Sequence, residues 1–196
     1  MSLTTFGKTF VTLFVVMDPI GTAPVFLALT SDRSGRDARR AAVAASAGAL
    51  AVALVFALFG QVVLAYLQVS LASLSIAGGL LLVLVALQML EGQTAAPEAG
   101  SGIALVPLAT PLLAGPGAIA TIMVLVRQQH GAPALLGVYL GIVATVLVVA
   151  AVLLLAERLG NWIPPSLLHF LTRILGFLLA AIAVQLVVNG ATALAR

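Results

Sequence analysis

Residues 10–27 read FVTLFVVMDPIGTAPVFL, an apolar stretch that Asp18 and Pro19 interrupt near its middle. Proline is favoured at the first position of a helix, and aspartate is favoured at the capping position before it. The pair therefore predicts that one helix ends here and a second helix begins. An aspartate in hydrocarbon costs roughly 3 kcal/mol, and such residues are usually functional. We therefore expect a broken membrane helix with an ionisable group at the break.

The composition of the whole chain places it in the membrane class. Of its 196 residues, 62% are hydrophobic and 8% are charged, and the mean hydropathy is +1.23. Because a soluble domain carries about 25% charged residues, hydrocarbon must form part of the surroundings of this chain. The net charge of +3 is small and the basic residues are not interleaved with aromatics, which disfavours a nucleic-acid partner. The absence of cysteine excludes disulfides and thiol chemistry.

The apolar stretches are long enough to cross a bilayer several times, because a spanning helix needs roughly 20 apolar residues. The sequence predicts one all-α membrane domain with six spans, near residues 7–29, 41–64, 70–90, 103–126, 133–156 and 168–194. The polar segment 91–102 is the predicted linker between a first half, 7–90, and a second half, 103–194. The lipid bilayer is accordingly an expected partner.

The basic residues are distributed unevenly between the two ends of these spans. Three of them fall on one side, namely Lys8, Arg127 and Arg196. Six fall on the other side: Arg33, Arg36, Arg39, Arg40, Arg158 and Arg173. The positive-inside rule then predicts that the 33–40 loop is cytoplasmic and that both termini lie outside.

The two halves share a pattern. Pro19 and Pro24 are five residues apart, as are Pro111 and Pro116, and the offset between the pairs is 92 (111 − 19). Three further pairs follow at an offset of 97: Gly79 with Gly176, Ala86 with Ala183, and Gln88 with Gln185. Because each half has three spans, the second half must enter the membrane from the opposite side, which is the inverted repeat of many secondary transporters. Chance alignment of apolar helices is the alternative, and the paired prolines and glutamines count against it.

The fourth span carries the same device as the first. Thr110 and Pro111 form a second cap and proline pair, followed by Gly115, Pro116 and Gly117. Both breaks are expected near the membrane midplane, with half-helix N-termini directed inward. Such termini expose unpaired N–H groups and a partial positive charge, which suit a carboxylate. A pair of simple proline kinks is the alternative reading.

These breaks define the expected substrate-binding residues. They are Asp18, Pro19, Gly21, Thr22, Pro24, Thr110, Pro111, Gly115, Pro116 and Gly117. Glycines among them allow a ligand to approach the backbone closely. Asp18 is left with four alternatives: to stay protonated, to carry a coupling proton, to hold Na⁺, or to face a substrate ammonium.

Other polar and small residues have weaker functional patterns. Gln88, Gln185 and Asn189 are interpreted either as a polar path or as interhelical hydrogen-bonding groups. Small residues at helical spacing predict close helix packing; they are Ala41, Ala45, Ala49, Gly137 and Gly141. We expect no metal site, because the two histidines fall on opposite sides of the membrane. We also expect no nucleotide-binding loop and no catalytic group. The chain is therefore not expected to be an enzyme or to hold a cofactor, and H⁺ and Na⁺ are the candidate coupling ions.

Two motifs carry a family resemblance. Residues 17–27, MDPIGTAPVFL, and residues 109–119, ATPLLAGPGAI, resemble the two signatures of the MarC family, and residues 76–86 and 188–190 are also similar to it. Family members carry Asn or Asp before the first proline, so Asp18 fits. The resemblance implies a six-span bacterial-type inner-membrane protein related to LysE-type exporters. Some relatives are described as transporters of small neutral amino acids such as glycine and alanine.

The residues and the resemblance together predict a secondary transporter or exporter of a small zwitterionic metabolite. In this interpretation Asp18 handles a cation or an ammonium, and the two breaks bind a carboxylate. A passive channel built on the same breaks and a non-transporting membrane scaffold are the alternatives. A homo-oligomer is compatible with the small-residue stripes.

Overall fold

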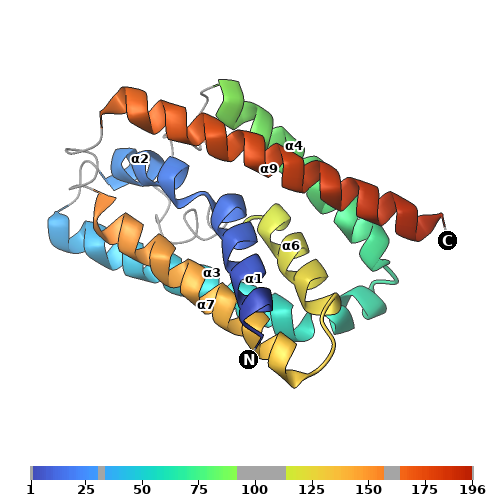
Figure 1. Cartoon of the computed structure of the whole chain (residues 1–196). Helices are drawn as coiled ribbons and strands as arrows, with labels where there is room; N and C mark the ends of the chain where they lie inside the picture. The colour runs from blue at the N-terminus through green and yellow to red at the C-terminus, as the bar shows by residue number, and fades with distance from the viewer. Residues whose placement is uncertain (1, 31–33, 92–113, 157–163, 196) are drawn as a thin grey trace.

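The computed structural model of the chain describes residues 2–30, 34–91, 114–156 and 164–195 (Figure 1). Its helices are α1 (Leu3–Met17), α2 (Pro19–Thr30), α3 (Gly35–Tyr66), α4 (Leu71–Glu91), α6 (Pro116–Arg127), α7 (Ala132–Leu154) and α9 (Pro165–Leu194). The residues described contain no strand. Five helical stretches, of which α1 with most of α2 is one, are long and apolar enough to cross a membrane, and α6 is a shorter apolar helix.

The helices match the predicted spans, with one notable extension. Helix α3 begins at Gly35, six residues before the predicted span 41–64. Ser34 caps it, because its Oγ accepts the N–H of Asp37 at 3.2 Å and its hydroxyl donates to the Asp37 carboxylate at 2.6 Å. A polar cap sets the start of a helix, whereas hydropathy marks only the part suited to lipid. Helix α3 therefore extends its arginine-rich first turns beyond the apolar segment.

The second half is described only in part. Residues 103–113, which begin the predicted fourth span, and 92–102 of the predicted linker lie outside the described residues. The remaining helices agree with prediction: α4 and α7 match 70–90 and 133–156 within two residues at each end, and α9 begins three residues before 168.

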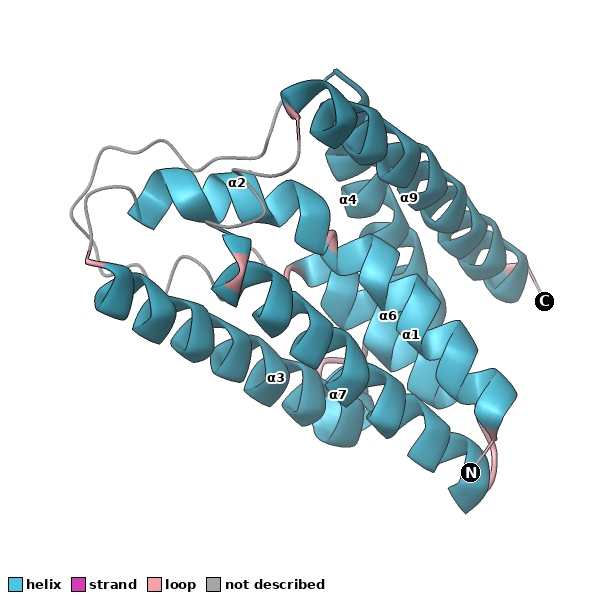
Figure 2. Ribbon diagram, turned by 60° about the vertical axis from the view of Figure 1, so that its left-hand side comes forward, coloured by secondary structure: helices cyan, strands magenta, loops and turns pink. Residues whose placement is uncertain are grey.

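Helices α4 and α9 form an antiparallel pair that is packed through glycine (Figure 2). A Cβ atom at Gly79 would lie 2.7 Å from the carbonyl oxygen of Ala183. Reciprocally, a Cβ atom at Gly176 would lie 3.3 Å from the carbonyl oxygen of Ala86. Gly79 corresponds to Gly176 in the repeat, and Ala86 corresponds to Ala183. The two contacts are therefore equivalent, as they would be if a two-fold axis related the two helices.

The predicted packing glycines lie between α1 and α7. A Cβ atom at Gly137 would lie 2.9 Å from the carbonyl oxygen of Ser2, and one at Gly141 would lie 2.8 Å from Cβ of Thr9. Thr145 adds a polar contact between the helices, because its hydroxyl donates to the carbonyl of Phe10 at 3.4 Å. The prediction that these glycines serve helix packing is confirmed.

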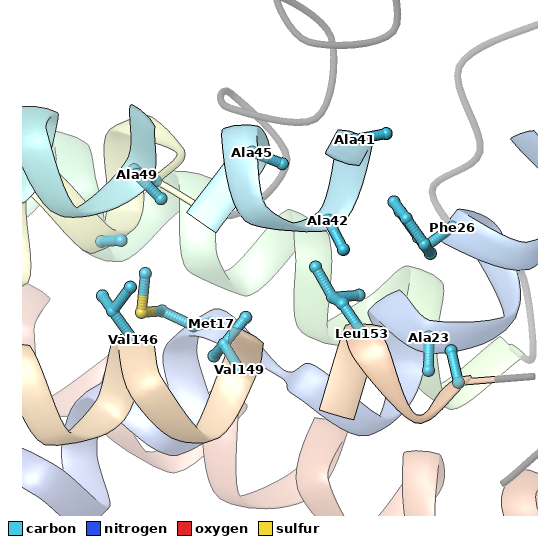
Figure 3. Packing of buried hydrophobic residues seen from close by; sticks show 13 residues of the cluster. Met17, Ala23, Phe26, Ala41, Ala42, Ala45, Ala49, Val146, Val149 and Leu153 are labelled. Atoms are coloured by element: carbon cyan, nitrogen blue, oxygen red, sulfur yellow. The ribbon is translucent and has the colours of Figure 1, made fainter. Parts of the chain in front are cut away.

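The small-residue stripe on α3 also packs as predicted. Ala41, Ala45 and Ala49 are each at most 5% exposed. They belong to a buried cluster that joins α3 to the α1–α2 region and to α7, shown in Figure 3; among its other members are Met17, Ala23, Phe26, Val146, Val149 and Leu153. This cluster fixes α1 and α2 against the rest of the bundle at the point where the chain is broken.

Both termini lie at one end of the bundle, which we call the terminal end (Figure 2). The N–H of Ser2 donates to the carbonyl of Pro133 at 3.0 Å, which joins the start of α1 to the start of α7. Helix α6 runs from the bundle interior toward this end, where Lys8 hydrogen-bonds to Gln128 just beyond α6. The arginine-rich start of α3 lies at the opposite end.

Candidate functional site

The chain is broken at Asp18, as the sequence predicts. Helix α1 ends at Met17, and Asp18 adopts a left-handed conformation with φ 39° and ψ 68°. Its N–H still donates to the carbonyl of Phe14 at 3.1 Å, and α2 begins at Pro19. Aspartate tolerates this conformation better than most residues, because its short polar side chain can hydrogen-bond locally.

The side chain of Asp18 caps the new helix. Its Oδ1 accepts the N–H of Gly21 at 3.0 Å. Its carbonyl accepts the hydroxyl of Thr22 at 2.7 Å and the N–H of Thr22 at 3.0 Å. A Cβ atom at Gly21 would overlap Oδ2 of Asp18. Gly21 is therefore needed to make room for the Asp18 carboxylate rather than for a ligand, and Thr22 reinforces the turn.

This geometry corrects one expectation about the break. The sequence predicts several free N–H groups at the start of α2, but the amide of Gly21 donates to the Asp18 side chain and that of Thr22 donates to the Asp18 carbonyl, which leaves the amide of Ile20. Pro19 has no N–H to offer. The carboxyl group of Asp18 thus already occupies the positive end of α2, so a second carboxylate is disfavoured there. No described residue donates a hydrogen bond to Oδ2 of Asp18.

The start of α6 is different, because no side chain caps it. Gly115 occupies the capping position, Pro116 is the first helical residue, and no side-chain hydrogen bond closes the end. The first N–H that bonds back to Gly115 is that of Ile119, at 3.1 Å. The N–H groups of Gly117 and Ala118 therefore point out of the helix end without an intrahelical partner.

The predicted cap pair of the fourth span, Thr110 and Pro111, lies outside the described residues. The described helix begins five residues later, at Pro116, within the predicted Gly115–Gly117 segment. A Cβ atom at Gly117 would clash with the side chain of Leu82 on α4. Gly117 therefore allows α6 to approach α4, and its amide rather than its Cα is the group available to a ligand.

The two interruptions lie side by side. Figures 1 and 2 both show the start of α6 next to the junction of α1 and α2. Met17, which precedes Asp18, shares one buried cluster with Ala114 and Ala118, which flank the start of α6. The carboxyl group of Asp18 and an uncapped helix N-terminus that carries partial positive charge are thus brought together within the bundle.

A buried hydroxyl lies on α3 in the same region. Ser46 follows Ala45, a member of the cluster that holds Met17 and Ala118, and is 4% exposed. Its Oγ has no hydrogen-bond partner among the described residues. An unpartnered buried polar group costs about 1–3 kcal/mol, so this hydroxyl is available to a polar partner.

A groove lined by both polar and apolar residues lies between this region and the terminal end. It is a cavity of about 170 Å³ between α1, α6 and α9, which we call the terminal groove. Its polar lining residues are Lys8, Thr12, Thr121, Gln128, Gln185 and Asn189. The structure thus brings Gln185 and Asn189 together, as the predicted polar path requires, and Gln185 Nε2 donates to Asn189 Oδ1 at 2.7 Å.

The third residue of the predicted path lies elsewhere. Gln88 is exposed near the end of α4, at the level where Gly176 of α9 packs against Met89. Gln185 is nine residues beyond Gly176 (185 − 176), which is about 14 Å along the helix. Within the described part of the chain, Gln88 and Gln185 therefore do not line one path.

The opposite end of the bundle carries a basic hollow. A cavity of about 950 Å³ is lined by Arg36, Arg39 and Arg40 of α3 and by Leu154 and Leu155. Arg40 and Asp37 are 3.9 Å apart and largely exposed, so this ion pair contributes little stability. Across the described ranges, no group of three His, Cys, Asp or Glu residues is placed to hold a metal ion.

Comparison with known proteins identifies relatives over nearly the full length. The model of a family described as MarC family integral membrane protein matches residues 3–195. The chain is 39% identical to the UPF0056 membrane protein MJ1677 of Methanocaldococcus jannaschii, and the match covers 97% of both chains. It is 32% identical to the UPF0056 inner membrane protein YhgN of Escherichia coli K12, covering 92% of both chains. No solved structure matches.

Proposed function

Because the chain belongs to the MarC family of integral membrane proteins, we propose that it is a secondary transporter of small neutral amino acids or similar zwitterions. The observation that supports this most strongly is the juxtaposition of Asp18 with the uncapped start of α6. Opposite charges separated inside a bundle complement a molecule that carries an ammonium and a carboxylate.

The two ends of the substrate have different partners. The ammonium donates to Oδ2 of Asp18, the oxygen that no described residue uses. The carboxylate accepts the N–H groups of Gly117 and Ala118, which the partial charge at the helix end makes favourable. Hydrogen bonds to charged groups contribute about 1.5–3 kcal/mol each, so two such contacts are enough for selective binding of a small solute.

We propose that transport occurs by alternating access of the two halves, which form an inverted repeat with six membrane crossings in total. The reciprocal contacts of Gly79 with Ala183 and of Gly176 with Ala86 fit a two-fold relation between the halves. Helix α6 has 12 residues, about 18 Å, which is little more than half of a hydrocarbon core of about 30 Å. It is then the second half of a broken fourth span, and both breaks lie near the midplane.

The same proposal includes location and orientation. A relative is named an inner membrane protein, and we place this chain in the corresponding membrane with several crossings. The arginines at the start of α3 favour a cytoplasmic position for that end. The terminal groove and both termini then face outward. A homo-oligomer, and H⁺ or Na⁺ as the coupling ion, stay predictions.

Counterflow in proteoliposomes tests the function. Vesicles containing the purified protein and loaded with unlabelled L-alanine are placed in dilute radiolabelled L-alanine. We expect saturable accumulation of label that transiently exceeds equilibrium, because a carrier exchanges internal for external substrate. Protein-free vesicles are the control. Flux that stays linear with concentration indicates a passive channel, and flux equal to the control for both alanine and glycine contradicts the proposal.

A further inference from the structure

The terminal groove is more than an opening, and we propose that it is a second binding site that recognises the substrate carboxylate through Lys8. This inference rests on the proposed transport of amino acids. It adds a capture step at the terminal end, separate from the site at Asp18 and α6.

The charge of the groove favours an anion. Among the described residues that line it, Lys8 is the charged one, the other polar groups are hydroxyls and amides, and none is acidic. The Lys8 ammonium donates to Gln128 Oε1 at 3.5 Å, a long contact that leaves its other donors available. A cleft lined by one sign of charge concentrates ligands of the opposite sign.

The size of the groove suits a small molecule. Its volume is about 170 Å³, below the roughly 300–1,000 Å³ of sites for drug-sized ligands. Gln185 and Asn189 hydrogen-bond to each other along the α9 wall and leave further amide donors and acceptors free to bind a ligand. These groups match a compact metabolite with one carboxylate and one further polar group.

The groove is aligned with the break site. Thr12 lies six residues before Asp18 on α1, and Thr121 lies six residues after Gly115 on α6, each about 9 Å along its helix. The Thr121 hydroxyl donates to the carbonyl of Gly117 at 2.8 Å. The groove therefore extends from Lys8 to within about two helical turns of both interruptions, so that a solute held at Lys8 is on the route to Asp18.

A simpler role for Lys8 predicts different results. Lysines near the ends of membrane helices often extend to the lipid headgroups and only anchor the helix. Arg127 is a matched control, because it is an exposed cation at the same end and is not among the residues that line the groove. An anchoring role predicts equal effects at both positions, whereas capture of a carboxylate predicts an effect at Lys8 alone.

Transport kinetics provide the first test, with external L-alanine as the probe. We expect Lys8→Met to raise KM about tenfold with the maximal rate within about twofold of wild type, because the carboxylate loses a charged partner worth about 1.4 kcal/mol. Lys8→Arg keeps the charge and is expected to stay within about threefold of the wild-type KM. Arg127→Met is expected to match the wild type.

Cysteine labelling provides a second test that does not depend on transport. The chain contains no cysteine, so Thr12→Cys introduces a single thiol in the groove. We expect a water-soluble maleimide to label it, and L-alanine to slow labelling at least fivefold. Alaninamide, which lacks the carboxylate, is expected to give no protection, and protection by L-alanine is expected to disappear when Lys8→Met is added.

The outcomes separate the two proposals. If Lys8→Met and Arg127→Met both transport L-alanine with equal kinetics, the capture site is overturned and the proposed transport function stands. Protection by L-alanine without any counterflow supports the site and contradicts the transporter. A thiol at position 12 that the maleimide never reaches, or that alaninamide protects as well as alanine, also overturns the capture site.

Discussion

Replacing Asp18 with alanine is expected to abolish transport and to destabilise the protein, whereas Asp18→Asn is expected to weaken transport alone. The carboxylate has two tasks: Oδ1 caps α2 through Gly21, and Oδ2 is free for a substrate ammonium. Asparagine caps a helix as well as aspartate does, but alanine does not. The two variants therefore separate the structural task from the binding task.

The expected magnitudes follow from these two tasks. Loss of the cap in Asp18→Ala costs about 0.5–2 kcal/mol of stability, and loss of the charged contact costs about 1.5–3 kcal/mol of binding. We expect Asp18→Asn to unfold within about 2 °C of wild type and to raise KM for L-alanine at least tenfold. Counterflow and thermal unfolding measure both effects on the same preparations. Wild-type kinetics in Asp18→Ala contradict the role assigned to this residue.

Gly21→Ala is expected to lower kcat/KM at least tenfold although the added group is only a methyl. Its Cβ would occupy the space of Asp18 Oδ2, so the carboxylate must leave its place at the start of α2. Alanine is a better helix former than glycine by about 1 kcal/mol, so helix propensity cannot account for a loss. Gly7→Ala on α1 is the matched control, because nothing lies within 4 Å of the added atom.

A double-mutant cycle shows whether Gly21 acts through Asp18. Once Asp18 is alanine, the carboxylate that the new methyl would displace is absent. We therefore expect the Asp18→Ala, Gly21→Ala double variant to unfold at no lower a temperature than Asp18→Ala alone. Contacting residues show such coupling, whereas independent sites add. Additive losses would show that Gly21 has a separate role.

Local sequence rules predicted the first break well. Capping preference and the missing N–H of proline both act within a few residues, so the identities of Asp18 and Pro19 were enough to predict the helix break. Ser34 and Asp37 form the cap that sets the start of α3. The predicted span instead followed hydropathy and therefore began at residue 41. Helix ends depend on caps and membrane segments depend on apolar length, so the two boundaries differ.

The contents of the site depended on tertiary structure. The side-chain conformation of Asp18 decides whether the N–H of Gly21 at the start of α2 is free or hydrogen-bonded, and the sequence does not show this conformation. The terminal groove requires α1, α6 and α9 to meet, and its members Lys8, Thr12, Thr121 and Gln128 were missed. A signal was present in the spacing, because Lys8 and Thr12 share a helix face, as do Gln185 and Asn189.

Thermal unfolding of the purified protein with L-alanine most directly tests whether the two breaks form one zwitterion site. A ligand at 100 times its dissociation constant stabilises the folded state by about 2.7 kcal/mol. We expect glycine or L-alanine to raise the unfolding temperature of the wild type, acetate and methylamine alone to have no such effect, and the rise to vanish in Asp18→Ala. No rise in the wild type, or an equal rise in Asp18→Ala, would contradict a zwitterion site at these breaks.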